Sequence, residues 1–116
     1  MIPITLKVEN VLHWAMFGLR ELFCILWDRI LRRGPRERQV AETVERQATP
    51  GDAASVLETI DRFAERRFLM NVGREKGAIL EDALSASSAK RVLELGCYCG
   101  YSAVSVGRIL QARGGR

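Results

Sequence analysis

Apolar residues recur every three or four positions along the first thirty residues of the chain. The series is Val8, Leu12, Ala15, Leu19, Leu22, Leu26 and Ile30. This spacing predicts one amphipathic helix. Because Arg20 and Glu21 interrupt it, each charge-free run is shorter than the roughly 18 residues expected of a membrane-spanning helix. Three interpretations stay open: a helix in the plane of a membrane, a single span, or a soluble helix packed on protein.

A basic cluster and a Gly-Pro pair follow this helix. The cluster consists of Arg29, Arg32, Arg33, Arg36 and Arg38. With Trp14 and Trp27, it favours a membrane surface that carries anionic headgroups. Gly34-Pro35 marks a linker. We therefore expect two domains: a membrane-anchor helix with a basic linker over residues 1–34, and a separate domain over residues 35–116.

Helical patterns and turns alternate in the first half of the second domain. Asp52 or Ser55 is suited to cap the helix that follows the Thr-Pro-Gly turn. That helix places Val56, Leu57, Ile60 and Phe63 on one face. The expected elements are a helix over 36–47, a turn over 49–52, a helix over 53–67, an apolar crossing over 68–73 and a helix over 74–86.

A strand, a tight turn and a helix are predicted next. Val92, Leu93 and Leu95 form the short apolar run of a buried parallel strand at about residues 91–95. Gly96 and Gly100 bracket the turn, and helical spacing starts at Ser102. The fold class is therefore α/β, mostly helical, with one clear strand and a preceding amphipathic helix.

This strand-turn-helix segment is typical of a nucleotide-type cofactor site. A glycine directly after a strand lets a ligand approach the backbone, and the following helix begins with unpaired N–H groups. Glu94 and Ser102 add polar side chains beside them. Since Tyr98 stands where the dinucleotide fingerprint needs a second glycine, S-adenosylmethionine suits the turn better than NAD. The alternative is a turn whose glycines serve backbone geometry alone.

Composition narrows the function classes further. The chain has 116 residues, of which 47% are hydrophobic and 28% charged, a globular balance rather than a disordered one. Its net charge of +4 and its 7% of aromatic residues do not indicate a nucleic-acid partner. Three cysteines without zinc-ligand spacing indicate a reducing compartment. We expect a membrane-associated chain facing the cytoplasm, with a soluble cytoplasmic protein as the alternative.

The glycine turn carries a family resemblance. Glu94-Leu-Gly-Cys-Tyr-Cys-Gly-Tyr-Ser-Ala-Val resembles the first cofactor motif of the catechol O-methyltransferase family, a group of cation-dependent enzymes that use S-adenosylmethionine. Two upstream blocks, Pro50 to Asp61 and Met70 to Gly77, resemble the segments that precede this motif in the family. The resemblance covers roughly residues 36–110 and implies the N-terminal part of a Rossmann-like methyltransferase fold.

The resemblance also implies roles for individual residues. The cofactor site would be lined by Val72, Glu94, Gly96, Tyr98 and Ser102. The pocket for a catechol-type substrate would include Phe68, Met70 and Asn71, with Phe68 in the place of the family's usual tryptophan. The family's reaction transfers a methyl group from S-adenosylmethionine to a catechol hydroxyl with Mg²⁺.

Several functional positions of the family have no counterpart in this sequence. Glu94 is its last acidic residue, so the acid that binds the cofactor ribose and the Mg²⁺ ligands are missing, as is the catalytic lysine. We therefore expect an incomplete methyltransferase domain over 35–116 that is inactive alone. The alternative is a non-catalytic membrane-associated protein that binds partners through a partial methyltransferase scaffold.

Overall fold

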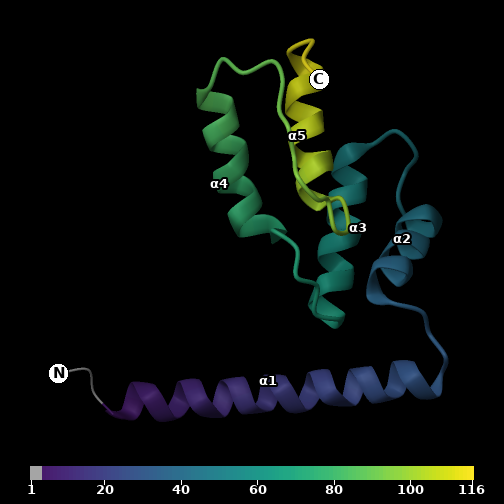
Figure 1. Ribbon diagram of the computed structural model, residues 1–116, viewed down its shortest axis with the longest axis vertical. Coiled ribbons are helices and arrows are strands. Elements are labelled where there is room, and N and C mark those ends of the chain that lie inside the picture. The colour runs from purple at the N-terminus through teal and green to yellow at the C-terminus, as the bar shows by residue number, and fades with distance from the viewer. Residues whose placement is uncertain (1–3) are drawn as a thin grey trace. The chain divides into compact units, whose positions relative to one another are not determined.

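The structure of the protein is a computed structural model that describes the backbone of residues 4–116 and the side chains of residues 10–116 (Figure 1). Residues 1–3 and the Val8 side chain, which belong to the predicted first helix, lie outside this description. The described helices are α1 (Ile4–Ile30), α2 (Arg36–Gln47), α3 (Ala53–Arg66), α4 (Gly73–Ala86) and α5 (Tyr101–Ala112). The chain separates into two compact units, Met1–Gly34 and Pro35–Arg116.

Helix α1 is unbroken and carries exposed apolar side chains. Trp14 and Leu19 are each 68% exposed. The Phe23 ring stacks on the Trp27 ring one turn later, with centroids 6.0 Å apart and planes at 14°, a pair that stabilises a helix locally. Across the described part of the chain, no helix combines the length and the apolar character needed to cross a membrane.

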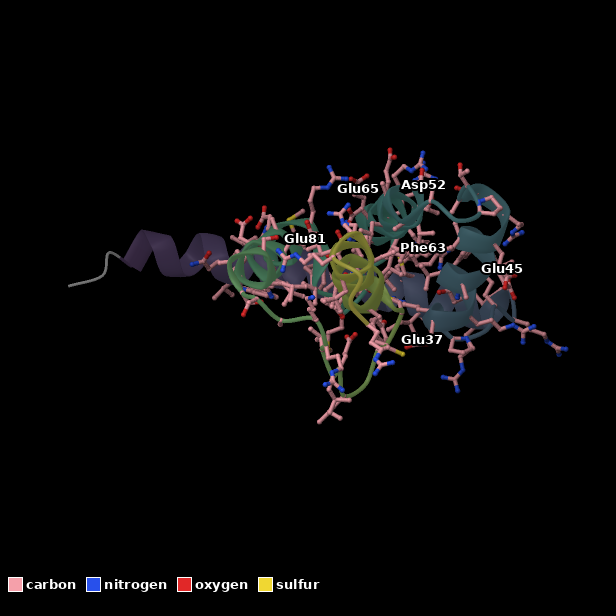
Figure 2. All side chains as sticks on the ribbon, turned by 90° about the horizontal axis from the view of Figure 1, so that it is seen from above. Glu37, Glu45, Asp52, Phe63, Glu65 and Glu81 are labelled. Atoms are coloured by element: carbon pink, nitrogen blue, oxygen red, sulfur yellow. The ribbon has the colours of Figure 1, made fainter. Side chains whose placement is uncertain are left out.

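Helices α2 to α5 pack around a small core in the second unit. Helix α3 lies against both α2 and α5, and α4 lies against α5 (Figure 1). The predicted inner face of α3 is confirmed, since Leu57 and Ile60 are buried and Phe63 packs against them. In Figure 2, Phe63 lies toward the middle of the unit, whereas Glu65 of the same helix lies at its edge. The buried centre consists of Val40, Leu57, Ile60, Leu69 and Tyr101.

Side chains complete the backbone hydrogen bonds at two helix ends. Asp52 caps α3 as predicted, because its Oδ1 accepts a hydrogen bond from the Ala54 backbone N–H at 2.9 Å. At the end of α4, the Arg113 guanidinium donates to the carbonyl oxygens of Leu84, Ser85 and Ser87 at 3.0, 2.9 and 3.1 Å. The Leu84 carbonyl also accepts from the Ser87 N–H and hydroxyl, so Arg113 adds to the hydrogen bonds that finish α4 and connects this end to the end of α5.

The predicted strand at residues 91–95 is wrong, because the residues that the structure describes include no β-strand. The Val92 N–H donates to the Arg116 carbonyl at 3.3 Å, and the Arg116 N–H donates to the Lys90 carbonyl at 2.8 Å. Leu93 is 83% and Leu95 is 89% exposed. A strand forms when a neighbouring strand offers a ladder of hydrogen bonds. Among the described residues, Arg116 pairs with the start of this segment, but no strand continues the ladder along it. The apolar residues of the segment alone therefore do not produce a strand.

Candidate functional site

Two segments that are distant in the sequence border one small cavity of about 80 Å³. Residues 70–72 lie between α3 and α4, and residues 96–102 form the turn before α5 together with its first residues. The structure thereby brings together six residues selected from the sequence: Met70, Asn71, Val72, Gly96, Tyr98 and Ser102. Cys97, Cys99 and Tyr101 also border this cavity.

The turn before α5 needs left-handed backbone at three positions. The φ angles of Gly96, Tyr98 and Gly100 are 85°, 46° and 81°. Glycine adopts such angles freely, whereas a tyrosine there costs on the order of 1 kcal/mol. The Gly100 N–H donates to the Cys97 carbonyl at 2.6 Å, which closes the turn. The backbone is therefore held tightly at the point where the sequence predicted a ligand.

Glu94 and Ser102 meet across this turn. The Ser102 hydroxyl donates to Glu94 Oε1 at 2.5 Å. Helix α5 begins at Tyr101, one residue before the predicted start, and has no side-chain cap at its N-terminus. The Tyr101 N–H lies beside the Cys99 thiol, so the N–H groups that follow it in the first turn are the ones open to an acceptor on a ligand. The helix dipole favours negative charge there.

Asn71 adds a further donor to the cavity. Its side-chain nitrogen Nδ2 is buried and has no hydrogen-bond partner among the described residues. Leaving a buried donor unpaired costs roughly 1–3 kcal/mol. A ligand acceptor placed in the cavity would remove that cost, so Asn71 is the strongest indication that the cavity binds a polar group.

Tyr101 is a site residue that the sequence did not reveal. Its hydroxyl donates to Asp61 Oδ2 at 3.2 Å, and Arg74 Nε donates to the same oxygen at 3.3 Å. Burial raises the pKa of Tyr101 to about 12, and the Asp61 charge acts in the same direction. Tyr101 and Asp61 are 40 residues apart, so local spacing gave no signal for this pair. The contact fixes the start of α5 against α3 and places the turn.

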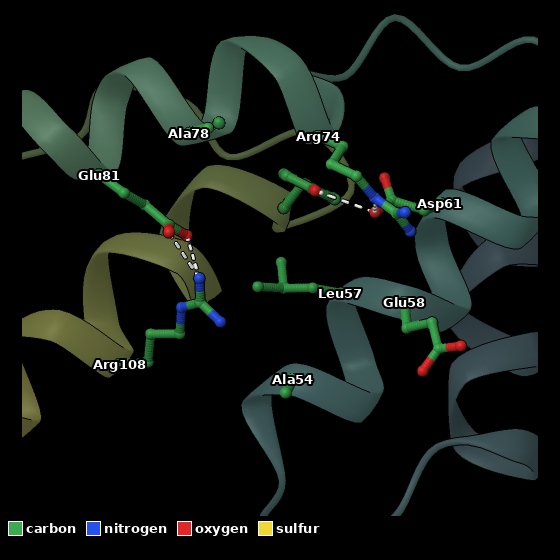
Figure 3. A pocket seen from close by; sticks show the side chains of 10 residues that line it. Ala54, Leu57, Glu58, Asp61, Arg74, Ala78, Glu81 and Arg108 are labelled. Atoms are coloured by element: carbon green, nitrogen blue, oxygen red, sulfur yellow. Dashed lines mark hydrogen bonds and ion pairs between the residues drawn. The ribbon is translucent and has the colours of Figure 1, made fainter.

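A larger cavity of about 410 Å³ lies among α3, α4 and α5 (Figure 3). Four of its five charged side chains form two ion pairs, and Glu58 is the one outside them. Arg108 donates to both carboxylate oxygens of Glu81 at 2.5 and 2.6 Å, as Figure 3 shows. The hydroxyl of the fully buried Ser105 also donates to Glu81 and, with Arg108, lowers the pKa of that carboxyl. Arg74 is likewise paired with Asp61, through one hydrogen bond. We therefore interpret these ion pairs as contacts that hold the helices together.

Two of the predicted site residues do not line the small cavity. Glu94 is one of them, although its carboxylate accepts a hydrogen bond from Ser102, which does line it. Phe68 does not border it; its carbonyl accepts a hydrogen bond from Arg36 at 2.6 Å, and its neighbour Leu69 occupies the buried position instead. Within the described residues, no group of three or more His, Cys, Asp or Glu side chains is arranged to hold a metal ion. The residues present therefore do not fit Mg²⁺, which takes several oxygen ligands.

Comparison with known proteins tests the resemblance directly. The sequence profile of the O-methyltransferase family matches residues 47–115. The chain is 46% identical to catechol O-methyltransferase B of Danio rerio over 81 residues, which are 69% of this chain and 31% of that protein. It is 44% identical to catechol O-methyltransferase of Mus musculus over 82 residues, which are 70% of this chain and 31% of that one.

A further relative carries a different name. The chain is 38% identical to a protein of Homo sapiens called transmembrane O-methyltransferase over 79 residues, which are 67% of this chain and 27% of that protein. The chain thus spans less than a third of the length of each of these three relatives. The matched residues 47–115 include both segments that border the small cavity. Because the family profile matches more than half of the chain, the chain belongs to the O-methyltransferase family.

Proposed function

We propose that the small cavity binds the amino-acid end of S-adenosylmethionine. The observation that carries this proposal is the buried, unpaired Asn71 Nδ2 beside the open first turn of α5. Both offer hydrogen-bond donors, which suit the carboxylate of an amino acid. Glu94, bonded through one oxygen to Ser102, has a second oxygen that suits the cofactor's ammonium group. Donors in the cavity, with the Glu94 carboxylate next to its lining residue Ser102, match a zwitterion.

The size of the cavity agrees with a partial cofactor site. About 80 Å³ accommodates one end of S-adenosylmethionine rather than the whole molecule. In this proposal Val72, Gly96 and Tyr98 line the site of S-adenosylmethionine. Met70 and Asn71, which the family resemblance assigns to the substrate pocket, lie next to the same molecule. Met70 is 79% exposed, so its side chain is available to a substrate. Phe68 would belong to the substrate pocket only if a further part of the domain covered it.

We propose that the complete family domain transfers a methyl group to a hydroxyl of a catechol. The support is the match to two relatives named catechol O-methyltransferase. A bound Mg²⁺ would supply a Lewis acid for that hydroxyl. Because the described residues do not form a Mg²⁺ site, we expect this chain to bind the methyl donor without transferring its methyl group.

We propose that the first unit attaches the chain to the cytoplasmic surface of a membrane. The exposed apolar side chains of α1, with Trp14 and Trp27 among them, suit the boundary between headgroups and acyl chains. The arginine cluster over residues 29–38 would add attraction to anionic lipids. In vesicle sedimentation, we expect binding to anionic vesicles and at least about tenfold weaker binding to neutral ones.

Calorimetric titration of the full chain with S-adenosylmethionine tests the cofactor proposal. We expect measurable binding, and we expect Asn71→Ala and Glu94→Gln to weaken it at least about tenfold. Asp82→Asn, which changes an exposed carboxylate on α4, is the matched control and should bind like the unmodified chain. Circular dichroism checks that each variant keeps its helices.

The alternatives give different results in the same experiments. A folded chain that binds NAD and not S-adenosylmethionine would contradict the cofactor proposal. A folded chain that binds anionic vesicles and no cofactor would support a non-catalytic membrane-associated protein that keeps part of the methyltransferase scaffold. Methylation of a catechol by this chain in the presence of Mg²⁺ would contradict the expected inactivity.

A further inference from the structure

Two cysteines stand on either side of Tyr98 in the turn before α5. Both Cys97 and Cys99 border the small cavity, and neither is in a disulfide. Cys97 is exposed and Cys99 is half-buried. The hydrogen bond from the Gly100 N–H to the Cys97 carbonyl holds the two residues within one closed turn. Two cysteines with free thiols thus border the same cavity within one closed turn.

The two thiols are also close enough to influence each other's ionisation. Burial raises the pKa of Cys99, and a negative charge on Cys97 raises it further. A shared electrophile removes this repulsion because both sulfur atoms then bond to one centre. Cys97 is the more accessible of the two, so it is placed to react first, and Cys99 to complete the second bond.

The number and chemical type of the ligating atoms indicate which class of ligand this pair of cysteines can bind. A structural zinc site takes four ligands, and within the described residues no third or fourth His, Cys, Asp or Glu joins this pair to form a metal-binding group. Thiolates are soft donors and prefer soft, thiophilic centres. The turn therefore suits a thiophilic atom that forms two bonds to sulfur and one bond to a carbon atom of its own molecule.

We propose that Cys97 and Cys99 form a dithiol site for trivalent organic arsenic compounds. The reaction balances without a redox partner. Two arsenic–sulfur bonds form, the arsenic–oxygen double bond of an arsenoxide breaks, and the two thiol protons leave with that oxygen as one molecule of water. This site depends on the two thiols and not on S-adenosylmethionine, so it stands or falls separately from the proposed cofactor site.

Phenylarsine oxide is the probe for this site, used on the full chain after its thiols have been reduced and the reductant removed. Of the three thiols of the chain, we expect one equivalent of probe to mask two and to leave Cys24 reactive toward a chromogenic disulfide. Trypsin cleaves at Arg91 and Arg108, so residues 92–108 form one peptide that contains both cysteines. Mass spectrometry should find the arsenic on that peptide, as one bridged adduct.

Single-cysteine variants decide whether both thiols are needed. We expect Cys97→Ser and Cys99→Ser each to weaken probe binding at least about tenfold, and the control Cys24→Ser to bind like the unmodified chain. Either of the first two variants binding with unchanged affinity would overturn the proposal, as would an adduct that links two chains. If Cys99→Ser loses its helices, the location of arsenic in the digest of the unmodified chain gives the answer.

Discussion

The inner face of α3 and the segment at residues 91–95 are both apolar, but only the face of α3 is buried. In α3, Leu57 and Ile60 are 6% and 2% exposed, because α2 and α5 pack against them. In the segment before the glycine turn, Leu93 and Leu95 remain almost fully exposed. Both stretches carry the pattern of buried structure, so the difference lies in their neighbours and not in their own residues.

The physical reason is the range of the hydrogen bonds in each element. A helix pairs its backbone groups internally and needs neighbours only for its apolar face. A parallel strand needs another strand for its backbone as well. An apolar segment with unmade ladder bonds is also a place where another chain can add. Residues 91–95 therefore need a neighbouring strand that the described part of the chain does not supply.

The largest expected effect tests this comparison with two truncations of similar size. Ile60→Ala removes a buried side chain and should lower the free energy of unfolding by about 3 kcal/mol. Leu93→Ala removes an exposed one and should change it by less than about 0.5 kcal/mol. Urea unfolding followed by circular dichroism measures both values.

Equal losses for the two variants would contradict the comparison. A loss at Leu93 that grows with protein concentration would instead show that residues 91–95 pair with another molecule in solution. Sedimentation velocity on the unmodified chain distinguishes these outcomes, because self-association increases the mass of the sedimenting species.

A smaller effect concerns alkaline pH and the contact that places the glycine turn. The pKa of Tyr101 rises from its ordinary value of 10.0 to about 12 in the folded chain. The neutral hydroxyl is therefore favoured by folding. Its contribution is complete below about pH 10 and is lost as the pH rises toward about 12, on the order of 2 kcal/mol in total.

Urea midpoints measured between about pH 9 and about pH 11 test this dependence. Tyr101→Phe should remove most of the alkaline loss of stability. The matched control is Tyr98→Phe, which changes a 45% exposed tyrosine in the same turn and should leave the pH dependence as it is. A Tyr101→Phe profile that still falls like that of the unmodified chain would refute the assignment.

The smallest expected effect compares two arginines. Arg113→Ala removes the donor that the carbonyls of Leu84, Ser85 and Ser87 share at the end of α4 and should cost about 1 to 2 kcal/mol. Arg46→Ala removes a solvent-exposed ion pair with Glu42 and should cost less than about 0.5 kcal/mol. Thermal unfolding of both variants gives the difference. Identical melting temperatures would mean that α4 does not rely on α5 for its termination.

Much of the candidate site was accessible to sequence reasoning. The glycines at 96 and 100 identify a turn because the turn needs left-handed backbone there. Residues 70–72 came from the family resemblance, and the structure places them at the same cavity. Phe68 was selected in the same way, yet it does not border that cavity, because its neighbour Leu69 takes the buried position.

Local sequence patterns were sufficient to predict the structural features that depend only on neighbouring residues. Residues within a few positions of one another predicted the helices, the Asp52 cap and the glycine turn. These features depend on hydrogen bonds and φ angles that are local. Tertiary structure decided which apolar segments are covered and that Tyr101 reaches Asp61. It also decided that, within the described chain, no strand lies beside residues 91–95. Those outcomes depend on contacts between distant parts of the chain, which no local pattern contains.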